Sequence, residues 1–268
     1  MTNSLERIFD GLIDALQSSV IPAIQDESAR SQAYGVLDML RNLKPRVEWA
    51  LGPLQDDVAQ QLASIARIAA LAAIHRFEWR GTPLEALGPG VDESSAASRE
   101  IAFWEELLDR WAFRPYPMLE WAISWLKAHR PVAPRVSLVH GDYRTGNFLE
   151  RDGRITAILD WELVHLGDPI EDLGWVCMRS FRGRSPYMCH LIERPRLYER
   201  YEALSGVPVD PAAVRFYEAF GTFKLAVIHV GAARCFEDGR FRDLRMAALG
   251  VHLPRLIMQV EGTIEGKT

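Results

Sequence analysis

Apolar residues at the start of the chain recur at intervals of three and four positions, the spacing of a helix that buries one face. This pattern predicts helices over residues 5–16, 28–42 and 54–76. We expect the second helix to end at Pro45, because proline lacks the N–H group that continues a helix. With no alternating strand pattern in this part of the chain, residues 1–63 are expected to form an N-terminal helical segment.

The pattern changes after a polar, turn-rich stretch at residues 80–98. Short strand signals follow, and an Arg-Asp-Gly turn joins the last two of them into a hairpin. The expected strands cover residues 136–139, 147–150 and 155–159. The expected helices on either side cover residues 99–111, 118–129, 170–180, 196–205, 211–235 and 240–261. The sequence therefore predicts a mainly α fold with a small β hairpin region, of the α+β class.

Composition narrows the range of functions. The chain has 268 residues, 48% of them hydrophobic, which is enough for a substantial core. Its formal net charge of -5 gives no basic field, so nucleic acid is not an expected partner. The three cysteines lack CxxC spacing, which favours a reducing, cytoplasmic location. The most apolar stretch, residues 65–74, is too short to span a bilayer, and no membrane association is expected.

One short region concentrates polar side chains between two apolar strands. His140, Gly141 and Asp142 are followed by Asn147, and the hairpin then ends at Asp160, 18 residues after Asp142. Phosphoryl transfer requires a carboxylate that accepts a hydroxyl proton, and oxygen ligands that hold magnesium against the phosphates of a nucleotide. A loop followed by a tight hairpin can bring these three side chains to one cleft.

The stretch from Leu138 to Trp175, with "LVHGDYRTGNFL" and "ITAILDWELVHLGDPIEDLGW", resembles the catalytic core of the aminoglycoside phosphotransferase family, relatives of protein kinases. It is most similar to the branch that includes the kinase-like domain fused to some acyl-CoA dehydrogenases. The resemblance implies that residues 64–268 form a kinase-like C-terminal lobe. It also implies ATP or GTP and Mg²⁺ as cofactors, and a hydroxyl group of a small molecule as the phosphoryl acceptor.

The same resemblance assigns roles to individual residues. Asp142 is expected to be the catalytic base, and Asn147 and Asp160 are expected to bind the nucleotide's magnesium. His140 is expected to support the loop through packing and hydrogen bonds. Asp168 and Asp172 are expected to be structural, with Asp168 near a helix start, where its charge suits the helix dipole.

Arg144 and Glu162 flank the expected ligands. Each is a candidate for contact with substrate or phosphate, and surface ion pairing is the alternative for both. Trp161 and Trp175 are candidates for lining a substrate pocket, although tryptophans at helical spacing usually belong to a core. His165 is expected to be a helix-entry or packing residue rather than a metal ligand.

The chain also departs from the family's pattern. The family has an N-terminal lobe with a five-stranded sheet, a phosphate-covering loop and a strand lysine that grips the nucleotide. Upstream of the loop the only lysines are Lys44 and Lys127, and neither lies in an expected strand. Three explanations stay open: a natural chain without the lobe, an altered chain, or a lobe supplied by another polypeptide.

Three functions follow from these observations. The first is a phosphotransferase that acts on a small-molecule hydroxyl, with an aminoglycoside-like compound or a hydroxyacyl-CoA as candidate acceptors. The second is an inactive kinase-like module that binds or regulates a partner, with the N-terminal helices as a candidate surface for a partner chain or a second copy. The third is metal-dependent hydrolysis by His140, Asp142, Asp160 and His165, which lack the paired spacing typical of metal-binding histidines.

Overall fold

The structure is a computed structural model that describes residues 5–151, 154–190 and 192–267, except for residues 50–64. The chain divides into two compact units, Met1–Leu62 and Ala63–Thr268. Each unit is described by itself below. The part of the expected helix 54–76 that precedes residue 65 lies outside the described residues.

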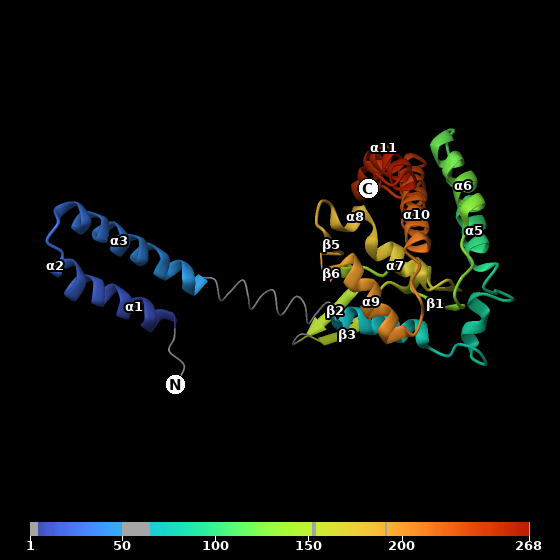
Figure 1. The fold of residues 1–268 in the computed structure, drawn as a ribbon. Coiled ribbons are helices and arrows are strands. Elements are labelled where there is room, and N and C mark those ends of the chain that lie inside the picture. The colour runs from blue at the N-terminus through green and yellow to red at the C-terminus, as the bar shows by residue number, and fades with distance from the viewer. Residues whose placement is uncertain (1–4, 50–64, 152–153, 191, 268) are drawn as a thin grey trace. The chain divides into compact units, whose positions relative to one another are not determined.

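The first unit is a helical hairpin, as its apolar spacing predicts. Two long helices lie side by side and run in opposite directions (Figure 1). Lys44 Nζ pairs with Asp10 Oδ1 at 2.7 Å across them, and Ile21 and Leu37 are buried. Its elements are α1 (Leu5–Ala15), a π-helical turn (Leu16–Val20), α2 (Ile21–Ala23) and α3 (Glu27–Trp49).

The expected end of the second helix at Pro45 is wrong, because α3 continues to Trp49. A proline removes one backbone donor from a helix, and the turns on either side can persist. The helix over residues 28–42 is otherwise confirmed, one residue longer at its start.

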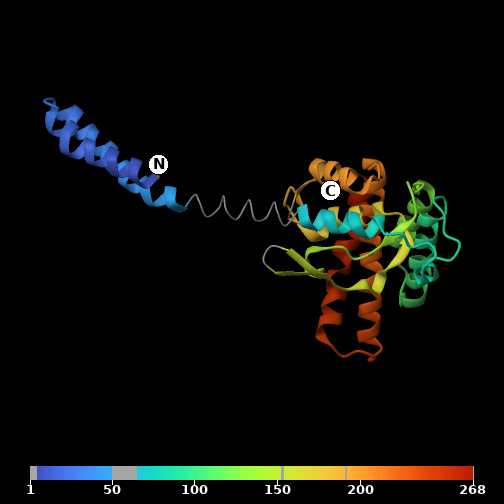
Figure 2. The same cartoon turned by 90° about the horizontal axis from the view of Figure 1, so that it is seen from below.

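Helices dominate the second unit. The first of them covers residues 65–76 and lies beside α9 in both ribbon views (Figures 1 and 2). All the helices expected after residue 98 are present, although the one expected over 170–180 is split after Cys177. They are α5 (Ala96–Trp111), α6 (Pro117–His129), α7 (Ile170–Cys177), α8 (Arg179–Arg182), α9 (Arg194–Ser205), α10 (Pro211–Glu237) and α11 (Leu244–Ile264).

The strands of this unit form three two-stranded antiparallel sheets among the described residues. The expected hairpin is confirmed: Phe148 faces Ile158 in the β2–β3 pair. The β1–β4 pair was not expected, and in it Val139 faces His165. The strands are β1 (Ser137–Val139), β2 (Phe148–Arg151), β3 (Arg154–Ile158), β4 (His165–Gly167), β5 (Tyr187–Met188) and β6 (Ile192–Glu193).

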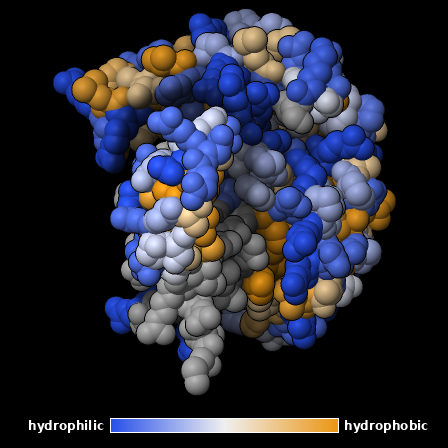
Figure 3. Space-filling model, turned by 60° about the vertical axis from the view of Figure 1, so that its left-hand side comes forward, coloured by the Kyte–Doolittle hydropathy of each residue, from blue (hydrophilic) through white to orange (hydrophobic). Residues whose placement is uncertain are grey.

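The core of the second unit is built around α10, which packs against α11, α7 and α5. Phe220, Phe223 and Val227 on this helix are almost completely buried. By length and composition α10 is apolar enough to cross a membrane, yet 72% of its most apolar window is buried inside the fold, as expected of a core helix. The face drawn in Figure 3 is largely hydrophilic, with hydrophobic residues in small groups.

This architecture confirms the mainly α, α+β fold class and places the polar region. The chain leaves β1 at Val139, passes through a short 3₁₀ turn (Thr145–Asn147) and enters the β2–β3 hairpin. It then reaches Asp160 and returns through β4 to the side of β1. Because β4 pairs with β1, the loop that starts at His140 and the segment that follows Asp160 are held next to each other.

Candidate active site

The backbone of the loop after β1 is anchored by one buried carboxylate. Asp172 Oδ2 accepts a hydrogen bond from the N–H of His140 at 2.8 Å, and its Oδ1 accepts one from the N–H of Gly141 at 2.9 Å. Gly141 has φ +83°, and a Cβ at this position would lie 2.5 Å from the carbonyl oxygen of Leu163. Only glycine therefore lets the loop turn here without moving the segment that precedes β4.

His140 is fully buried, and both of its ring nitrogens face backbone groups. Its Nδ1 accepts a hydrogen bond from the N–H of Asp142 at 3.1 Å, so the ring proton is assigned to Nε2. That nitrogen lies 3.0 Å from the carbonyl oxygen of Leu159, to which it donates. His140 thus joins the loop to the end of the hairpin, and it has no nitrogen left for a metal ion.

Asp142 lies at the centre of the site, with a side chain that is 13% exposed. Its Oδ1 accepts hydrogen bonds from Trp175 Nε1 at 2.9 Å and from Arg144 Nε at 3.0 Å. Its Oδ2 accepts one from Asn147 Nδ2 at 2.7 Å. Three side chains from the loop and from α7 therefore fix the direction of this carboxylate.

Asn147 is buried, and its amide nitrogen is committed to Asp142, since Nδ2 also donates to the Asp142 carbonyl oxygen at 2.8 Å. The amide oxygen is the side-chain atom that remains to serve as a cation ligand. The backbone of Asn147 is fixed as well, because its carbonyl oxygen accepts a hydrogen bond from the N–H of Leu159 at 2.8 Å.

Asp160 follows Leu159 directly and is exposed. It has a left-handed backbone with φ 68° and ψ 56°, which aspartate tolerates better than most residues. The N–H of Leu159 donates to the carbonyl oxygen of Asn147, and the carbonyl oxygen of Leu159 accepts from His140. The backbone that carries Asp160 is therefore tied to the loop that follows β1. Mg²⁺ prefers oxygen donors, and the exposed Asp160 carboxylate and the Asn147 amide oxygen are groups of that kind.

The remaining candidates from the sequence occupy different surroundings. Trp175 is buried against Asp142, while the half-buried Trp161 donates from Nε1 to the carbonyl oxygen of Ile158 at 2.8 Å. The Trp161 ring lies 4.5 Å from that of His140, between centroids. Glu162 is exposed. Trp161 thus packs under the loop, and Trp175 and Arg144 are the candidates that contact the central carboxylate.

The two aspartates expected to be structural are both buried. Burial by itself raises the pKa of Asp172, but hydrogen bonds from His75 and from the loop hold that pKa below its usual value. His75 Nε2 lies 3.0 Å from Asp172 Oδ2, and its Nδ1 lies 2.6 Å from the Tyr201 hydroxyl. Helix 65–76 and α9 thus both support the carboxylate that anchors the loop.

Asp168 caps α7, because its Oδ1 accepts a hydrogen bond from the N–H of Ile170 at 2.9 Å. Its Oδ2 accepts one from the Tyr217 hydroxyl at 3.0 Å. Burial raises the pKa of Asp168 to about 7, and these two hydrogen bonds only partly oppose that rise. The expected place of Asp168 at a helix start agrees with this geometry.

His165 lies in a buried ionic cluster. Its Nε2 is 3.2 Å from Glu171 Oε2 and 3.8 Å from Glu100 Oε1. Burial lowers the pKa of His165, but the two carboxylates outweigh it and raise the pKa to about 9. Among the described residues, Glu100, His165 and Glu171 form the one group of His, Cys, Asp or Glu side chains whose ligand atoms lie close enough together to hold a metal ion. The four residues of the hydrolase hypothesis do not form such a set.

Lys224, in the middle of α10, is a contact of the loop that our sequence analysis missed. It is 1% exposed, and its Nζ donates to the carbonyl oxygen of Gly141 at 2.9 Å and to Glu171 Oε1 at 3.1 Å. The signal for it was present, because Lys224 is the only charged residue between Glu218 and Arg234. A lysine in such a run needs a buried partner.

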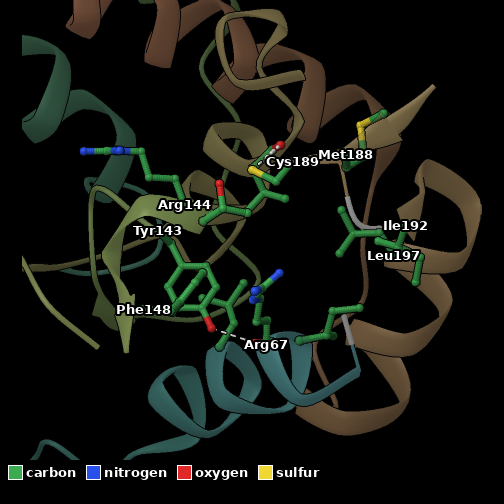
Figure 4. A pocket seen from close by; sticks show the side chains of 12 residues that line it. Arg67, Tyr143, Arg144, Phe148, Met188, Cys189, Ile192 and Leu197 are labelled. Carbon is green, nitrogen blue, oxygen red and sulfur yellow. Dashed lines mark hydrogen bonds between the residues drawn. The ribbon is translucent and has the colours of Figure 1, made fainter. Parts of the chain in front are cut away.

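An apolar cavity begins next to the loop that follows β1 (Figure 4). Tyr143, Arg144 and Thr145, which directly follow Asp142, form one wall. The Tyr143 hydroxyl donates to the carbonyl oxygen of Arg67 at 2.6 Å, and the Arg144 guanidinium points away from the cavity. Burial raises the pKa of the Cys189 thiol to about 11, so this lining cysteine is a neutral thiol near pH 7. The other lining residues are Arg67, Ile68, Leu71, Phe148, Val176, Met188, Ile192 and Leu197.

Comparison with known proteins places this fold and site in a family. The helical lobe with its acidic loop defines a kinase-like phosphotransferase. Residues 10–217 match the family described as "Phosphotransferase enzyme family" (APH), which is more than half of the chain. The chain belongs to this family.

Among curated proteins, the chain is 30% identical over 175 residues to acyl-CoA dehydrogenase family member 10 of Mus musculus. That segment covers 60% of this chain and 16% of the relative. It is 28% identical over 188 residues to acyl-CoA dehydrogenase family member 11 of Gallus gallus, covering 65% of this chain and 24% of that protein. The chain therefore spans less than a quarter of the length of these relatives.

A solved structure from Ralstonia eutropha, described as an aminoglycoside phosphotransferase, has a TM-score of 0.68 against this chain. The two sequences are 24% identical, and the match covers 78% of this chain and 67% of the other. At this identity the likeness supports the fold.

Proposed function

We propose that the protein transfers the γ-phosphoryl group of ATP or GTP to a hydroxyl group of a small molecule. The observation that carries this proposal is the Asp142 carboxylate, which Arg144, Asn147 and Trp175 hold in one direction. A base that is oriented before the substrate binds loses no free energy to reorganisation during the reaction.

Each residue has a definite task in this proposal. Asp142 accepts the proton of the acceptor hydroxyl while the oxygen of that hydroxyl forms a bond to the γ-phosphorus and the bond between the γ-phosphorus and the nucleoside diphosphate breaks. The Asn147 amide oxygen and the Asp160 carboxylate would hold magnesium. Bound magnesium supplies positive charge that offsets the charge of the phosphates. Arg144 keeps Asp142 in place from its half-buried position.

The cavity beside the loop favours an acceptor that has an apolar part. Its lining is mostly apolar, none of the described lining residues is acidic, and the Arg144 guanidinium points away from the cavity. An aminoglycoside carries several positive charges and requires acidic partners, whereas the acyl chain of a hydroxyacyl thioester fits an apolar lining. We therefore favour a hydroxyacyl compound as the acceptor.

One observation favours the alternative, an inactive kinase-like binding module. All four lysines of the chain lie in the described residues, and none of them lies in a strand. A strand lysine is the group that grips the nucleotide phosphates in protein kinases. The acidic loop supports catalysis, and the lysine positions support the binding module.

Phosphoryl transfer measured by ³¹P NMR separates the two functions. The protein would be incubated with Mg²⁺ and ATP or GTP, together with a hydroxyacyl thioester, a free hydroxy acid or an aminoglycoside. We expect transfer to the hydroxyacyl compound, with a loss of about 10²- to 10⁴-fold in kcat for D142N and little change in nucleotide affinity. D238N, which alters an exposed carboxylate paired with Arg234, is the control.

Turnover that survives in D142N would show that Asp142 is not the base. Nucleotide binding without transfer to any acceptor class would support the binding module instead.

A further inference from the structure

A buried ammonium group approaches the catalytic loop from the core of the second unit. Lys224 Nζ lies 2.9 Å from the carbonyl oxygen of Gly141, the residue that precedes Asp142. The same atom lies 5.0 Å from the ring centroid of Trp175 and 5.3 Å from that of Trp104. Burial of a lysine is costly unless the charge is paired and hydrogen-bonded, and Lys224 meets both conditions here.

The contact with Gly141 completes the restraint on one peptide unit. The Gly141 carbonyl oxygen accepts from Lys224, and the N–H of Asp142, in the same peptide plane, donates to His140 Nδ1. Both polar groups of this plane are therefore held by buried side chains. The plane is rigid, so its orientation fixes the position of the Asp142 Cα and the N–Cα bond about which its side chain is oriented.

We propose that Lys224 is a positioning residue for Asp142, and that the Glu171 carboxylate balances its charge. This inference rests on the proposed phosphotransferase function, because it assigns Lys224 a part in holding the base. Glu171 Oε1 pairs with Lys224 at 3.1 Å, and its Oε2 pairs with His165 at 3.2 Å. Burial raises the pKa of Glu171, but these two cations outweigh it and lower that pKa.

The cluster is better suited to this task than to holding a metal ion. Glu100, His165 and Glu171 place their ligand atoms within 4.8 Å of one another, but Lys224 already provides a positive charge beside Glu171. A divalent cation at this place would face the repulsion of that ammonium group.

The geometry separates a role in the loop from a role in stability. K224M and E171Q both break the same buried ion pair, but only K224M removes the donor to the Gly141 carbonyl oxygen. The double variant K224M/E171M replaces the pair by apolar side chains, a change that often restores stability. K127M is a matched surface control, because Lys127 pairs with Glu105 at 2.6 Å and is half exposed.

Hydrogen exchange read by mass spectrometry on a peptide that covers residues 138–149 tests the restraint without any need for turnover. We expect K224M and K224M/E171M to raise the exchange rate in this peptide about tenfold, the effect of one lost hydrogen bond. E171Q should raise the rate less than K224M does, because the donor to the Gly141 carbonyl oxygen remains, and K127M should leave the rate near that of the wild type. Thermal unfolding of each variant shows whether it is folded.

Steady-state kinetics on the same variants provides the second measurement. We expect kcat to fall about 10- to 100-fold in K224M and K224M/E171M, with KM for the nucleotide nearly unchanged. Recovery of wild-type exchange and kcat in the double variant would overturn the proposal, as would equal losses in E171Q and K224M. If the wild type transfers no phosphoryl group, the proposed function fails, and the exchange rates still decide whether Lys224 holds the loop.

Discussion

The two acidic residues of the candidate site differ in how the protein holds them. The carboxylate of Asp142 is largely buried and accepts hydrogen bonds from Arg144, Asn147 and Trp175. Asp160 is exposed, and no described residue bonds its carboxylate, although its backbone is tied to the loop through Leu159. The Asp142 carboxylate is thus fixed in advance, whereas the Asp160 carboxylate is free, as the proposed role of a cation ligand requires.

The largest effect on stability is expected at Asp172, whose carboxylate anchors the loop that carries Asp142. Asp172→Ala removes the acceptor for the N–H groups of His140 and Gly141 and leaves His75 Nε2 without its carboxylate partner. Removal of one member of a buried pair typically costs about 3–5 kcal/mol, and we expect a loss of that order in the free energy of unfolding. Urea denaturation of the wild type and of the variant measures it.

Asp238→Ala serves as the control for this change, because it removes an exposed carboxylate and should leave the urea midpoint nearly unchanged. If Asp172→Ala were as stable as that control, Asp172 would not anchor the loop.

A smaller effect is expected from Asp168, which lies only four residues before Asp172 but has a different charge state. Its pKa is raised from 3.8 to about 7 in the folded protein, so the folded state keeps a proton that the unfolded state releases between these values. Stability should therefore fall as pH rises from about 4 to 7, by about 2–4 kcal/mol. The lowered pKa of Asp172 has the opposite effect on stability. It stabilises the folded protein at pH values above the usual pKa of an aspartate, and this stability is lost as the pH falls below that value.

Asp168→Asn removes this titration while the side-chain oxygen that caps α7 can remain. Urea unfolding of this variant at several pH values between 4 and 7 should give a flatter profile than that of the wild type. An identical slope in both proteins would contradict the raised pKa of Asp168.

Much of the fold follows from the spacing of apolar residues. The helices are long enough for their period of 3.6 to be visible, and the Arg-Asp-Gly turn indicates the β2–β3 hairpin. The strand β4 was missed because three residues are too few to show an alternation, and it forms only because β1 lies beside it. The continuation of α3 past Pro45 was missed because a proline signals a helix end without enforcing it.

The site divides in a similar way. Asp142, Asn147 and Asp160 were found because their order along the chain is typical of phosphoryl transfer, and their assigned roles stay predictions. The left-handed backbone of Asp160 and the contact of Lys224 with Gly141 were not foreseen. Lys224 is 83 residues away from Gly141 in the sequence, so only tertiary packing brings the two together.

The most direct test of the account is calorimetric binding of ATP with and without Mg²⁺ to the wild type and to Asp160→Asn. Asparagine tolerates the left-handed backbone of this exposed position, so the fold should be retained while the negative charge is removed. We expect Mg²⁺ to tighten ATP binding to the wild type about tenfold or more, and this gain to disappear in the variant. An equal magnesium-dependent gain in both proteins would contradict the assignment of Asp160 as the metal ligand.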